Sequence, residues 1–430
     1  MIWALRASGL LAIGVLVSAL MIPYSSTVVS GESVNSRQIS VPARPLEVVC
    51  PGSMYQVGGE TGTEVDSVEP IADADFFLIR NGEATPFRGA NPALFTAEGD
   101  AQSSVELSGY QWQELNEFRI SGLASISCKK PVTEAWMLGG KTNLGSESLL
   151  ILHNPDVLST ILDMRFYEGG EEVADSTSLA PGETKVINLS RYLSTDQAAG
   201  INIQSQGGRF AAWVQSKTNS GITPTGVDLE AHNQLQTNPS LLITAQSDDL
   251  PTELKIPELS ILVTESISTT ISVSSLDGGF GDAFRVDLDA GVNSVQLPDL
   301  ETGTYRVTLE AESALLSSTT TNPLIPDFYI TQSEKAVSGD IQIAAVIEGV
   351  VEIAAVDPTV ATLKITRDGE TVAALIGEVS GQKMLSAEVA RGDKIEISGD
   401  KLLIRVKNDS TEYLAVDNSN LGTELEITVR

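Results

Sequence analysis

The stretch LDMRFYEGG, from Leu162 to Gly170, decides the fold class of this chain. It is a short run of strand-forming residues that ends in two glycines, which accept the positive φ angles of a tight hairpin turn. The same strand-then-glycine pattern recurs at Phe76 to Gly82, Ile271 to Gly279 and Thr362 to Gly369. Because long stretches with helical periodicity are scarce, the chain is predicted to be all-β.

The spacing of these turns predicts tandem β-units. Short strands recur within repeats of about 80–110 residues, a size typical of an immunoglobulin-like β-sandwich. A single large propeller is the competing architecture, but the repeats are too long for blades of about 40–50 residues. Proline-bearing stretches mark the boundaries, so the predicted units are residues 45–131, 132–245, 246–322 and 323–430.

The composition limits the classes of partner. The 430 residues include 27 Lys and Arg against 57 Asp and Glu, and the net charge is −30. Nucleic acid would be repelled along most of such a surface, and a patch for anionic lipid head groups is not expected either. Apolar residues make up 42%, which is typical of a globular protein and not of a disordered acidic tail.

Residues 1–30 indicate a targeting segment. Leu10 to Ile22 carries no charge and follows the basic residue Arg6, a pattern typical of a cleaved signal peptide or a retained signal anchor. A buried N-terminal helix is the alternative. Residues 31–44 are polar and serine-rich, and we expect a linker there. The chain is therefore predicted to be extracytoplasmic, either anchored by one span with its C-terminal part outside or secreted after cleavage.

The sequence contains two cysteines, Cys50 and Cys128. An even number of cysteines outside the cytoplasm indicates a disulfide. In the chain-entropy model, closing so long a loop stabilises the fold by about 4.5 kcal/mol. Two free buried thiols are the alternative. A metal site is not expected, because no other His or Cys lies nearby in the sequence to complete a tetrahedral set.

The amino-acid sequence of the second predicted unit resembles a known family. The strings that carry the resemblance are Cys50 to Gly52, Cys128 to Pro131, Ala135 to Thr142, Leu149 to Pro155, Leu179 to Glu183, Gly207 to Trp213 and Ser220 to Asp228. Together they resemble an actinobacterial family of exported envelope proteins known only as a domain of unknown function, of the DUF 5719 type. The resemblance is dense over residues 45–232. It implies a location and a fold class, and it supplies no catalytic residues.

The most distinctive string runs from Gly221 to Asp228. Gly221 and Gly226 bracket Pro224, which predicts a tight loop in which Asp228 accepts backbone N–H bonds. Because loops at the end of a sandwich usually carry recognition, these four residues form a candidate recognition loop. A structural loop that closes the second unit is the alternative.

Other candidate sites have simpler explanations. Asp277 to Asp282 combines carboxylates with glycines, as calcium loops do, but a hairpin turn is the simpler interpretation. Arg391-Gly392-Asp393 matches an integrin-binding string, yet a glycine turn between strands explains it. His153 and His232 lack metal-ligand spacing, and no GxSxG nucleophile elbow occurs. Short helical turns are expected over Gln111 to Phe118.

These observations favour a non-enzymatic structural or binding role in the cell envelope. No cofactor and no catalytic residue are expected, and the expected partner is an envelope protein or a wall glycan. The alternatives are a carbohydrate-binding or wall-associated enzyme accessory, and an accessory subunit of an envelope glycosyltransferase or exporter. Membrane contact is expected through the N-terminal segment alone.

Overall fold

The computed structural model describes residues 37–41, 45–58, 67–98, 107–246, 256–322, 327–415 and 425–429. Over these residues the chain is all-β, as the sequence predicts, apart from the 3-10 turn η1 (Leu189–Arg191). Chain contacts divide the protein into residues 44–422 and a small unit made of residues 1–43 and 423–430. In the small unit β1 (Arg37–Val41) pairs antiparallel with β33 (Leu425–Val429).

The predicted targeting segment, residues 1–30, lies outside the described residues. Within the part of the chain that the structure describes, no helix has the length and apolar character needed to cross a membrane.

The first strand group, β2 to β9, forms two strand pairs and one four-stranded sheet. β2 (Leu46–Cys50) pairs with β7 (Ala93–Ala97), and β3 (Tyr55–Val57) pairs with β4 (Val68–Pro70). The sheet has the order β6–β5–β8–β9, and its strands are β5 (Ala74–Arg80), β6 (Glu83–Gly89), β8 (Leu107–Glu117) and β9 (Ile120–Ser127).

The helical turns expected over Gln111 to Phe118 are wrong, because β8 runs through most of this segment. Glutamine is a good helix former, which misled the prediction. In the structure Gln111 and Gln113 are buried, and their side-chain amides bond to neighbouring backbone.

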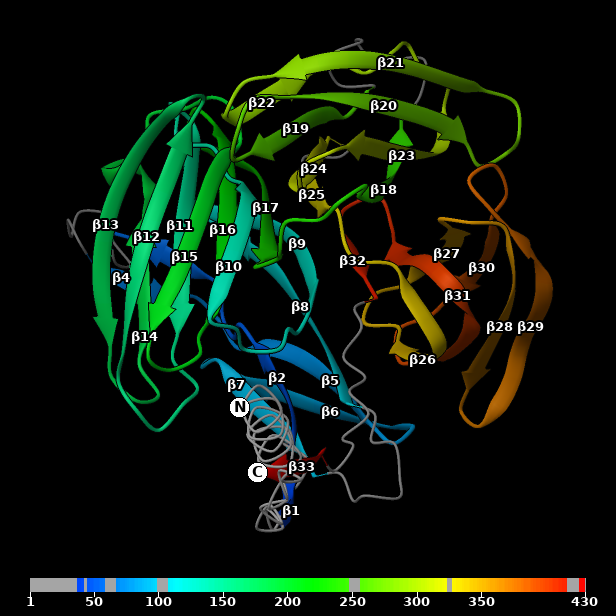
Figure 1. Ribbon diagram of the computed structural model, residues 1–430, viewed down its shortest axis with the longest axis horizontal. Helices are drawn as coiled ribbons and strands as arrows, with labels where there is room; N and C mark the ends of the chain where they lie inside the picture. The colour runs from blue at the N-terminus through cyan, green and yellow to red at the C-terminus, as the bar shows by residue number, and fades with distance from the viewer. Residues whose placement is uncertain are drawn as a thin grey trace, which may run out of the picture. The chain divides into compact units, whose positions relative to one another are not determined.

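The second and third strand groups share one topology (Figure 1). In the second group, one sheet is β10–β15–β12–β13 and the other is β14–β11–β16–β17. Its strands are β10 (Glu134–Gly139), β11 (Ser146–His153), β12 (Thr160–Glu168), β13 (Glu171–Leu179), β14 (Thr184–Asn188), β15 (Ala199–Gln206), β16 (Ala211–Ser220) and β17 (Thr223–Ala231). Neither order is the consecutive meander of a propeller blade.

The third group repeats these orders as β18–β23–β20–β21 and β22–β19–β24–β25. Its strands are β18 (Ser240–Ala245), β19 (Glu258–Val263), β20 (Ile267–Ser275), β21 (Gly281–Leu288), β22 (Gly291–Val295), β23 (Gly303–Ala311), β24 (Leu315–Thr321) and β25 (Tyr329–Gln332). β18 precedes the predicted boundary after residue 245 and β25 follows the one after residue 322, yet both pair within this group. The domain boundaries themselves stay predictions.

The fourth group is a seven-stranded sheet built around one long strand, β31, whose two halves pair with different neighbours. The first half of β31 pairs with β26 and β28, and its second half pairs with β27 and β32. Its strands are β26 (Val337–Ala344), β27 (Gly349–Ala355), β28 (Thr359–Arg367), β29 (Glu370–Val379), β30 (Leu385–Val389), β31 (Lys394–Lys407) and β32 (Glu412–Leu414).

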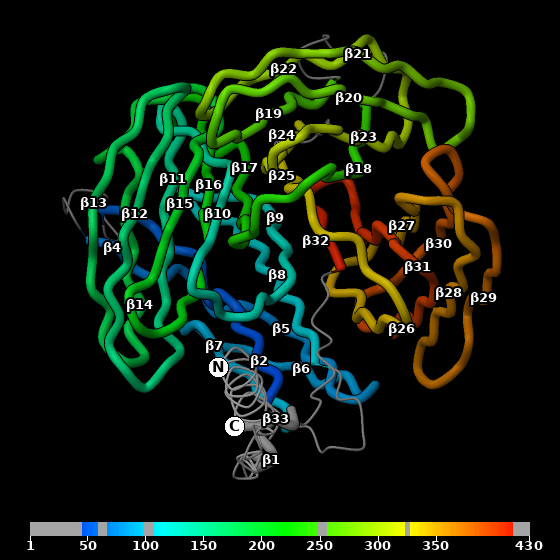
Figure 2. Tube along the Cα trace, viewed as in Figure 1, coloured from blue at the N-terminus to red at the C-terminus, as the bar shows by residue number. Residues whose placement is uncertain are grey.

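The glycine-led hairpins occur where the sequence predicts them. β5–β6, β12–β13, β20–β21 and β28–β29 are antiparallel hairpins, and the tube in Figure 2 can be followed through their turns. Gly82, Gly169, Gly278 and Gly369 each have positive φ. These turns suit glycine because it has no Cβ to clash in that backbone region.

Each repeated group has its own apolar core, and further cores join the groups. The two sheets of the second group pack on one cluster, and so do the two sheets of the third. Four further clusters each combine buried residues of two groups. The first and second groups share one that includes Leu115 and Trp213, the second and third share one that includes Trp136 and Leu262, the third and fourth share one that includes Leu242 and Leu403, and the fourth and first share one that includes Ile343 and Ile79. Each group therefore packs against two others, and the fourth contacts the first.

Candidate functional site

Four edge strands, one from each group, meet within residues 44–422. They are β9, β17, β25 and β32, and each lies at the rim of its own sheet. Edge strands leave backbone groups unpaired, so another partner must satisfy them when they are buried. At this meeting place, which we call the edge-strand junction, buried side chains supply that partner.

Asp327 binds the backbone of two other groups. Its carboxylate accepts N–H bonds from Leu123 of β9 at 3.0 Å, from Val227 of β17 at 3.3 Å and from Phe328 at 3.0 Å. Burial raises the pKa of Asp327 to about 6, and the three N–H bonds oppose that rise. The side chain replaces the neighbouring strand that β9 and β17 lack.

Two glycines make room for Asp327. Gly122 and Gly226 have φ of +147° and +146°. A Cβ would come within 2.7 Å of Asp327 Oδ1 at Gly122, and within 2.9 Å of that atom at Gly226. Both positions therefore suit glycine for space and for backbone conformation.

The structure corrects the single loop expected over residues 221–228. Gly221 lies in the turn between β16 and β17, but Pro224, Gly226 and Asp228 lie within β17. Asp228 is 2% exposed, and it accepts the N–H of Ile330 in β25, a different strand group, at 2.6 Å. The loop prediction failed because this partner is distant in sequence. A recognition role for the four residues stays a prediction.

Asp228 and Glu230 are buried, and no cation of the described residues is paired with either carboxyl. Burial raises the pKa of Asp228 well above its usual range, and nearby Asp327 and Glu412 add to the rise. Burial also raises the pKa of Glu230 strongly, with a further contribution from Asp228. We call Asp228, Glu230 and Asp327 the carboxyl cluster.

Glu230 lies against the second group's other sheet. A Cβ at Gly139 of β10 would come within 1.7 Å of Glu230 Oε2. Gln332 Nε2 donates to Oε2 at 3.4 Å, while Oε1 has no hydrogen-bond partner among the described residues. An acid held in this way is stabilised in its protonated form.

A second buried polar group, the Arg405 network, consists of Arg405, Glu352, Glu412 and Lys407. Arg405 is fully buried, and its Nε donates to Glu352 at 2.7 Å and its Nη1 to Glu412 at 3.0 Å. Lys407 Nζ lies 3.2 Å from Glu352 Oε1. Glu412 also accepts the Thr331 hydroxyl, which ties β32 to β25. Every charge in this network has an opposite charge beside it.

The pKa values within the Arg405 network follow from these pairs. Burial alone would raise the pKa of Glu352, but Arg405 and Lys407 lower it below its usual range. The pKa of Glu412 is raised, because its burial outweighs the effect of Arg405. Burial would lower the pKa of Arg405, but the two carboxylates raise it, so the guanidinium stays charged.

A small cavity lies at the edge-strand junction. It has a volume of about 50 Å³, and Ser125, Glu230, Thr331 and Glu412 help to line it. A cavity needs roughly 10–15 Å³ to hold one water molecule, and ligand pockets start at roughly 300 Å³. The junction therefore has room for a few waters and none for a sugar or peptide.

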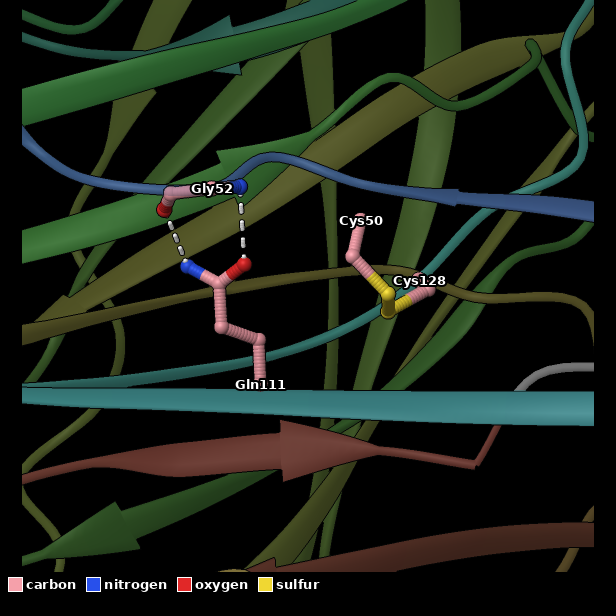
Figure 3. The surroundings of a disulfide bond; sticks show 4 residues. All are labelled: Cys50, Gly52, Gln111 and Cys128. Atoms are coloured by element: carbon pink, nitrogen blue, oxygen red, sulfur yellow. Dashed lines mark hydrogen bonds between the residues drawn. A yellow bond between two sulfur atoms is a disulfide. The ribbon is translucent and has the colours of Figure 1, made fainter. Parts of the chain in front are cut away.

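The structure joins Cys50 to Cys128 in a disulfide, as the sequence predicts (Figure 3). The bridge links β2 to the residue after β9, and both cysteines are fully buried. Gly109 of β8 faces the bridge, where a Cβ would come within 2.9 Å of Cys128 Sγ.

Beside the disulfide, glutamine side chains bond to the segment after Cys50. Gln111 accepts the Gly52 N–H at 2.9 Å and donates to Gly52 O at 2.7 Å, a pair that Figure 3 draws. Gln215 of β16 makes the same two contacts with Tyr55, each at 2.7 Å. Each amide thus replaces a strand neighbour, and Gln215 joins the second group to the first.

The other candidate residues have structural partners. Asp393 is 1% exposed and accepts two bonds from Arg367 at 2.8 Å, so the carboxylate of the Arg-Gly-Asp string is not displayed, although Arg391 and Gly392 are exposed. Buried His153 contacts the Thr184 hydroxyl at 3.0 Å, and burial lowers its pKa. Around Asp277 to Asp282, as elsewhere in the described residues, no three acidic, His or Cys side chains are placed to hold a metal ion.

Sequence reasoning missed the most connected residues of this site. Asp327, Gln111, Gln215 and Arg405 stand in strings with no recognisable pattern, and their partners lie far away in the chain. The available signal was the Gly-Val-Asp string of residues 226–228, in which the glycine and the acid both contact residues 327–330.

Comparisons with known proteins place the chain in a family. A crystal structure described as Thermotoga maritima 1070 has a TM-score of 0.21 and 10% identity, covering 24% of this chain and 94% of that one. A tetra-tandem repeat from the extending region of a large adhesion protein has a TM-score of 0.13 and 10% identity, covering 81% and 93%. No curated protein matches the chain in sequence. The profile of the family of unknown function DUF5719 matches residues 84–339, more than half of the chain. The chain therefore belongs to the DUF5719 family.

Proposed function

We propose that this chain is an exported, non-enzymatic binding and structural protein of the cell envelope. In this proposal its strand groups are tandem immunoglobulin-like units, and its partner is an envelope protein that adds a strand to β29. The observation that carries the proposal is the contrast between β29 and the other outer hairpin strands. Export is supported by the buried disulfide between Cys50 and Cys128, a bond typical of oxidising compartments.

Three outer strands carry features that discourage strand addition. β6 contains Pro86, β13 contains Glu171, Glu172 and Asp175, and β21 contains Asp282, Arg285 and Asp287. Charges and proline on an edge strand are the usual protection against pairing with another chain.

β29 lacks this protection. No charged residue and no proline occurs between Glu370 and Glu378. Val372 and Ile376 are 49% and 78% exposed, and Val360 on the adjacent β28 is 61% exposed. Among the described residues β29 pairs with β28 alone, so its other side is a sheet edge, with Leu385 of β30 close to Gly377 near the end of the strand. We call this strand and its exposed apolar side chains the β29 edge.

The charges at the ends of the β29 edge favour a particular partner. Pairing with a second copy of itself, centred at Ala374, would place Glu370 opposite Glu378, and like charges in facing positions are destabilising. An apolar extended segment with basic residues at both ends would instead meet opposite charges. Strand addition would give affinity through the main chain and specificity through alternate side chains.

A non-enzymatic role is also supported by the setting of the acidic residues. The carboxyls with the most strongly raised pKa values, Asp228 and Glu230, are 2% and 3% exposed. Asp228 bonds to the backbone of β25, and the cavity beside Glu230 has a volume of about 50 Å³. Carboxyls in that position serve the contact between strand groups.

The experiment titrates the full chain with a synthetic peptide of alternating Val and Thr flanked by two lysines at each end. Binding should slow hydrogen exchange of β29 amides and leave β13 amides unchanged. Replacing Ile376→Lys should weaken binding about fivefold, because one apolar cross-strand contact is lost and a charge repels the basic ends.

The matched control is Val173→Lys on β13, where Val173 is 41% exposed on an outer strand of the same kind. This variant should bind the peptide like the parent chain. Equal binding of a peptide with glutamates in place of the lysines, or equal weakening by both substitutions, would contradict the proposed partner chemistry.

A further inference from the structure

Three connections between strand groups meet at one place. They are the segments that follow β9, β17 and β25 and lead into β10, β18 and β26. His232 Nε2 lies 3.0 Å from Lys130 O, and Asn233 Nδ2 donates to Ser333 O at 2.7 Å. Gln236 Nε2 also donates to Ser333 O, at 2.8 Å. Each connection is thus bonded to another.

These connections border a hollow of about 500 Å³, which we call the linker hollow. Ligand pockets have volumes of roughly 300–1,000 Å³ and occur preferentially where domains meet. The hollow is large enough for a sugar unit. Its volume is far larger than that of the cavity at the edge-strand junction, although Lys129 and Glu334 line both.

The charge of the linker hollow is opposite to that of the chain. Among the described residues, its charged lining consists of Lys129, Lys130, Lys335 and Glu334, which sum to +2 in a chain whose net charge is −30. Lys129 forms an ion pair with Glu334. His232 adds no charge near neutral pH, because burial, helped by Lys129, lowers its pKa to about 4.

A second hollow shows that this surplus is not a general property of the surface. It has a volume of about 530 Å³ and lies along β20, β21 and β23. The charged residues described along it are two arginines and three acids: Arg285, Arg306, Glu310, Glu312 and Asp357. The net charge of this lining is negative, like that of the chain, whereas the net charge of the linker hollow's lining is positive.

We propose that the linker hollow binds an anionic sugar, one that carries a carboxylate or a phosphate. A concave surface of one sign concentrates ions of the other, and lysine ammonium groups act as point charges for oxyanions. The side chains of Gln234 and Thr237 add neutral donors and acceptors for sugar hydroxyls. The described residues that line the hollow include no aromatic side chain, so charge takes the place of ring stacking in this recognition.

The proposal deepens the envelope role by naming a ligand class, and it rests on that role only for the source of the sugar. Its site is formed by the connections between groups and not by the β29 edge. Either binding activity can therefore fail in its own assay while the other is retained.

The test is calorimetric titration of the purified full chain with glucuronate, glucose 6-phosphate, inorganic phosphate and glucose at low salt. Glucuronate and glucose 6-phosphate should bind, and glucose should not. The double variant Lys130→Gln, Lys335→Gln should weaken binding about tenfold, because two charged contacts are lost. Raising the salt concentration should weaken binding to the parent chain.

The matched control is Lys185→Gln, Lys364→Gln, which changes the net charge equally at lysines outside the hollow's lining. This variant should bind like the parent chain. Equal weakening by both double variants would overturn the site, and so would the absence of binding to either anionic sugar. If inorganic phosphate bound as tightly as glucose 6-phosphate, the contacts to the sugar would be refuted.

Discussion

The Arg405 network and the carboxyl cluster are two buried polar regions that differ in how their acidic side chains are stabilised. In the network, Arg405 lies between Glu352 and Glu412. In the cluster, neither Asp228 nor Glu230 is paired with a cation from the part of the chain that the structure describes, and their pKa values rise strongly because they are buried. Both regions connect strand groups, one by matched charges and the other by backbone N–H bonds to carboxyls. The difference teaches that a buried acid can be accommodated by pairing it or by favouring its protonated form.

The largest effect should come from removing the shared cation of the network. Arg405→Met would leave Glu412 as a buried carboxylate without a cation and Glu352 with Lys407 alone, so the free energy of unfolding should fall by about 3–5 kcal/mol. Denaturant titration at pH 7 measures this. The matched control is Lys401→Met, whose ion pair with Asp357 is solvent-exposed and should contribute little.

A double variant sharpens the same point. Arg405→Met combined with Glu412→Leu removes the carboxylate that the single change leaves without a cation, while Glu352 keeps Lys407 Nζ at 3.2 Å. Its stability should recover most of the loss, because apolar packing often replaces a buried ion group without cost. A double variant as unstable as Arg405→Met would show that the loss comes from packing and not from unpaired charge.

A smaller effect is expected in the carboxyl cluster. Asp327→Asn keeps one acceptor oxygen but turns an amide donor toward one of the three backbone N–H groups that Asp327 accepts. The free energy of unfolding should fall by about 1–3 kcal/mol. Hydrogen exchange should also speed up at Leu123 and Val227. Unchanged exchange at both amides would contradict the bonds assigned to Asp327.

Asp327 of the carboxyl cluster and Glu352 of the Arg405 network should make the stability depend on pH in opposite directions. Burial raises the pKa of Asp327 to about 6. Between about pH 4 and pH 6 the folded state therefore keeps a proton on Asp327 that the unfolded state has released. Its contribution is present below the unfolded pKa near 4 and is lost as pH rises through 6. The lowered pKa of Glu352 gives stability that is present above its unfolded pKa and is lost as pH falls.

Unfolding titrations between pH 4 and pH 8 test this contrast. Between pH 4 and 6, Asp327→Asn should remove part of the decline in stability with rising pH, and Glu352→Gln should leave that part in place. If both variants gave parallel curves over the whole range, the opposite pH dependence assigned to Asp327 and Glu352 would be wrong.

The smallest expected effect is a gain in the free energy of unfolding. Glu230→Gln replaces a buried acid of raised pKa by a neutral side chain of similar shape, so the cost of holding the proton disappears. The free energy of unfolding should rise by up to about 1 kcal/mol at pH 8 and change less at pH 5. A loss of stability at pH 8 would show that the Glu230 carboxylate is needed in its charged form.

Local signals in the sequence sufficed for the hairpins and the disulfide. The turn at Gly169, for example, depends on residues that are adjacent in the chain, and so glycine marks it directly. Cys50 and Cys128 could be paired because the sequence offers no other cysteine. Such features need no knowledge of which strands become neighbours.

The junction was less predictable, because its chemistry depends on distant partners. Asp228 reaches Ile330, and Gln215 reaches Tyr55, and neither contact leaves a pattern in the nearby sequence. An aspartate near glycines favours a loop when read locally, whereas the structure places Asp228 within β17. Burial turned a predicted loop acceptor into a contact between groups.

The most direct test of the proposed function is site-specific photo-crosslinking in the native envelope. A photoreactive residue would replace Ala374 on β29 in one variant and Ala174 on β13 in another, both at exposed positions of outer hairpin strands. We expect Ala374 to crosslink to an envelope protein through an apolar segment with basic ends, and Ala174 to give no such product. Equal products at both positions, or none at Ala374, would contradict the β29 edge as the binding surface.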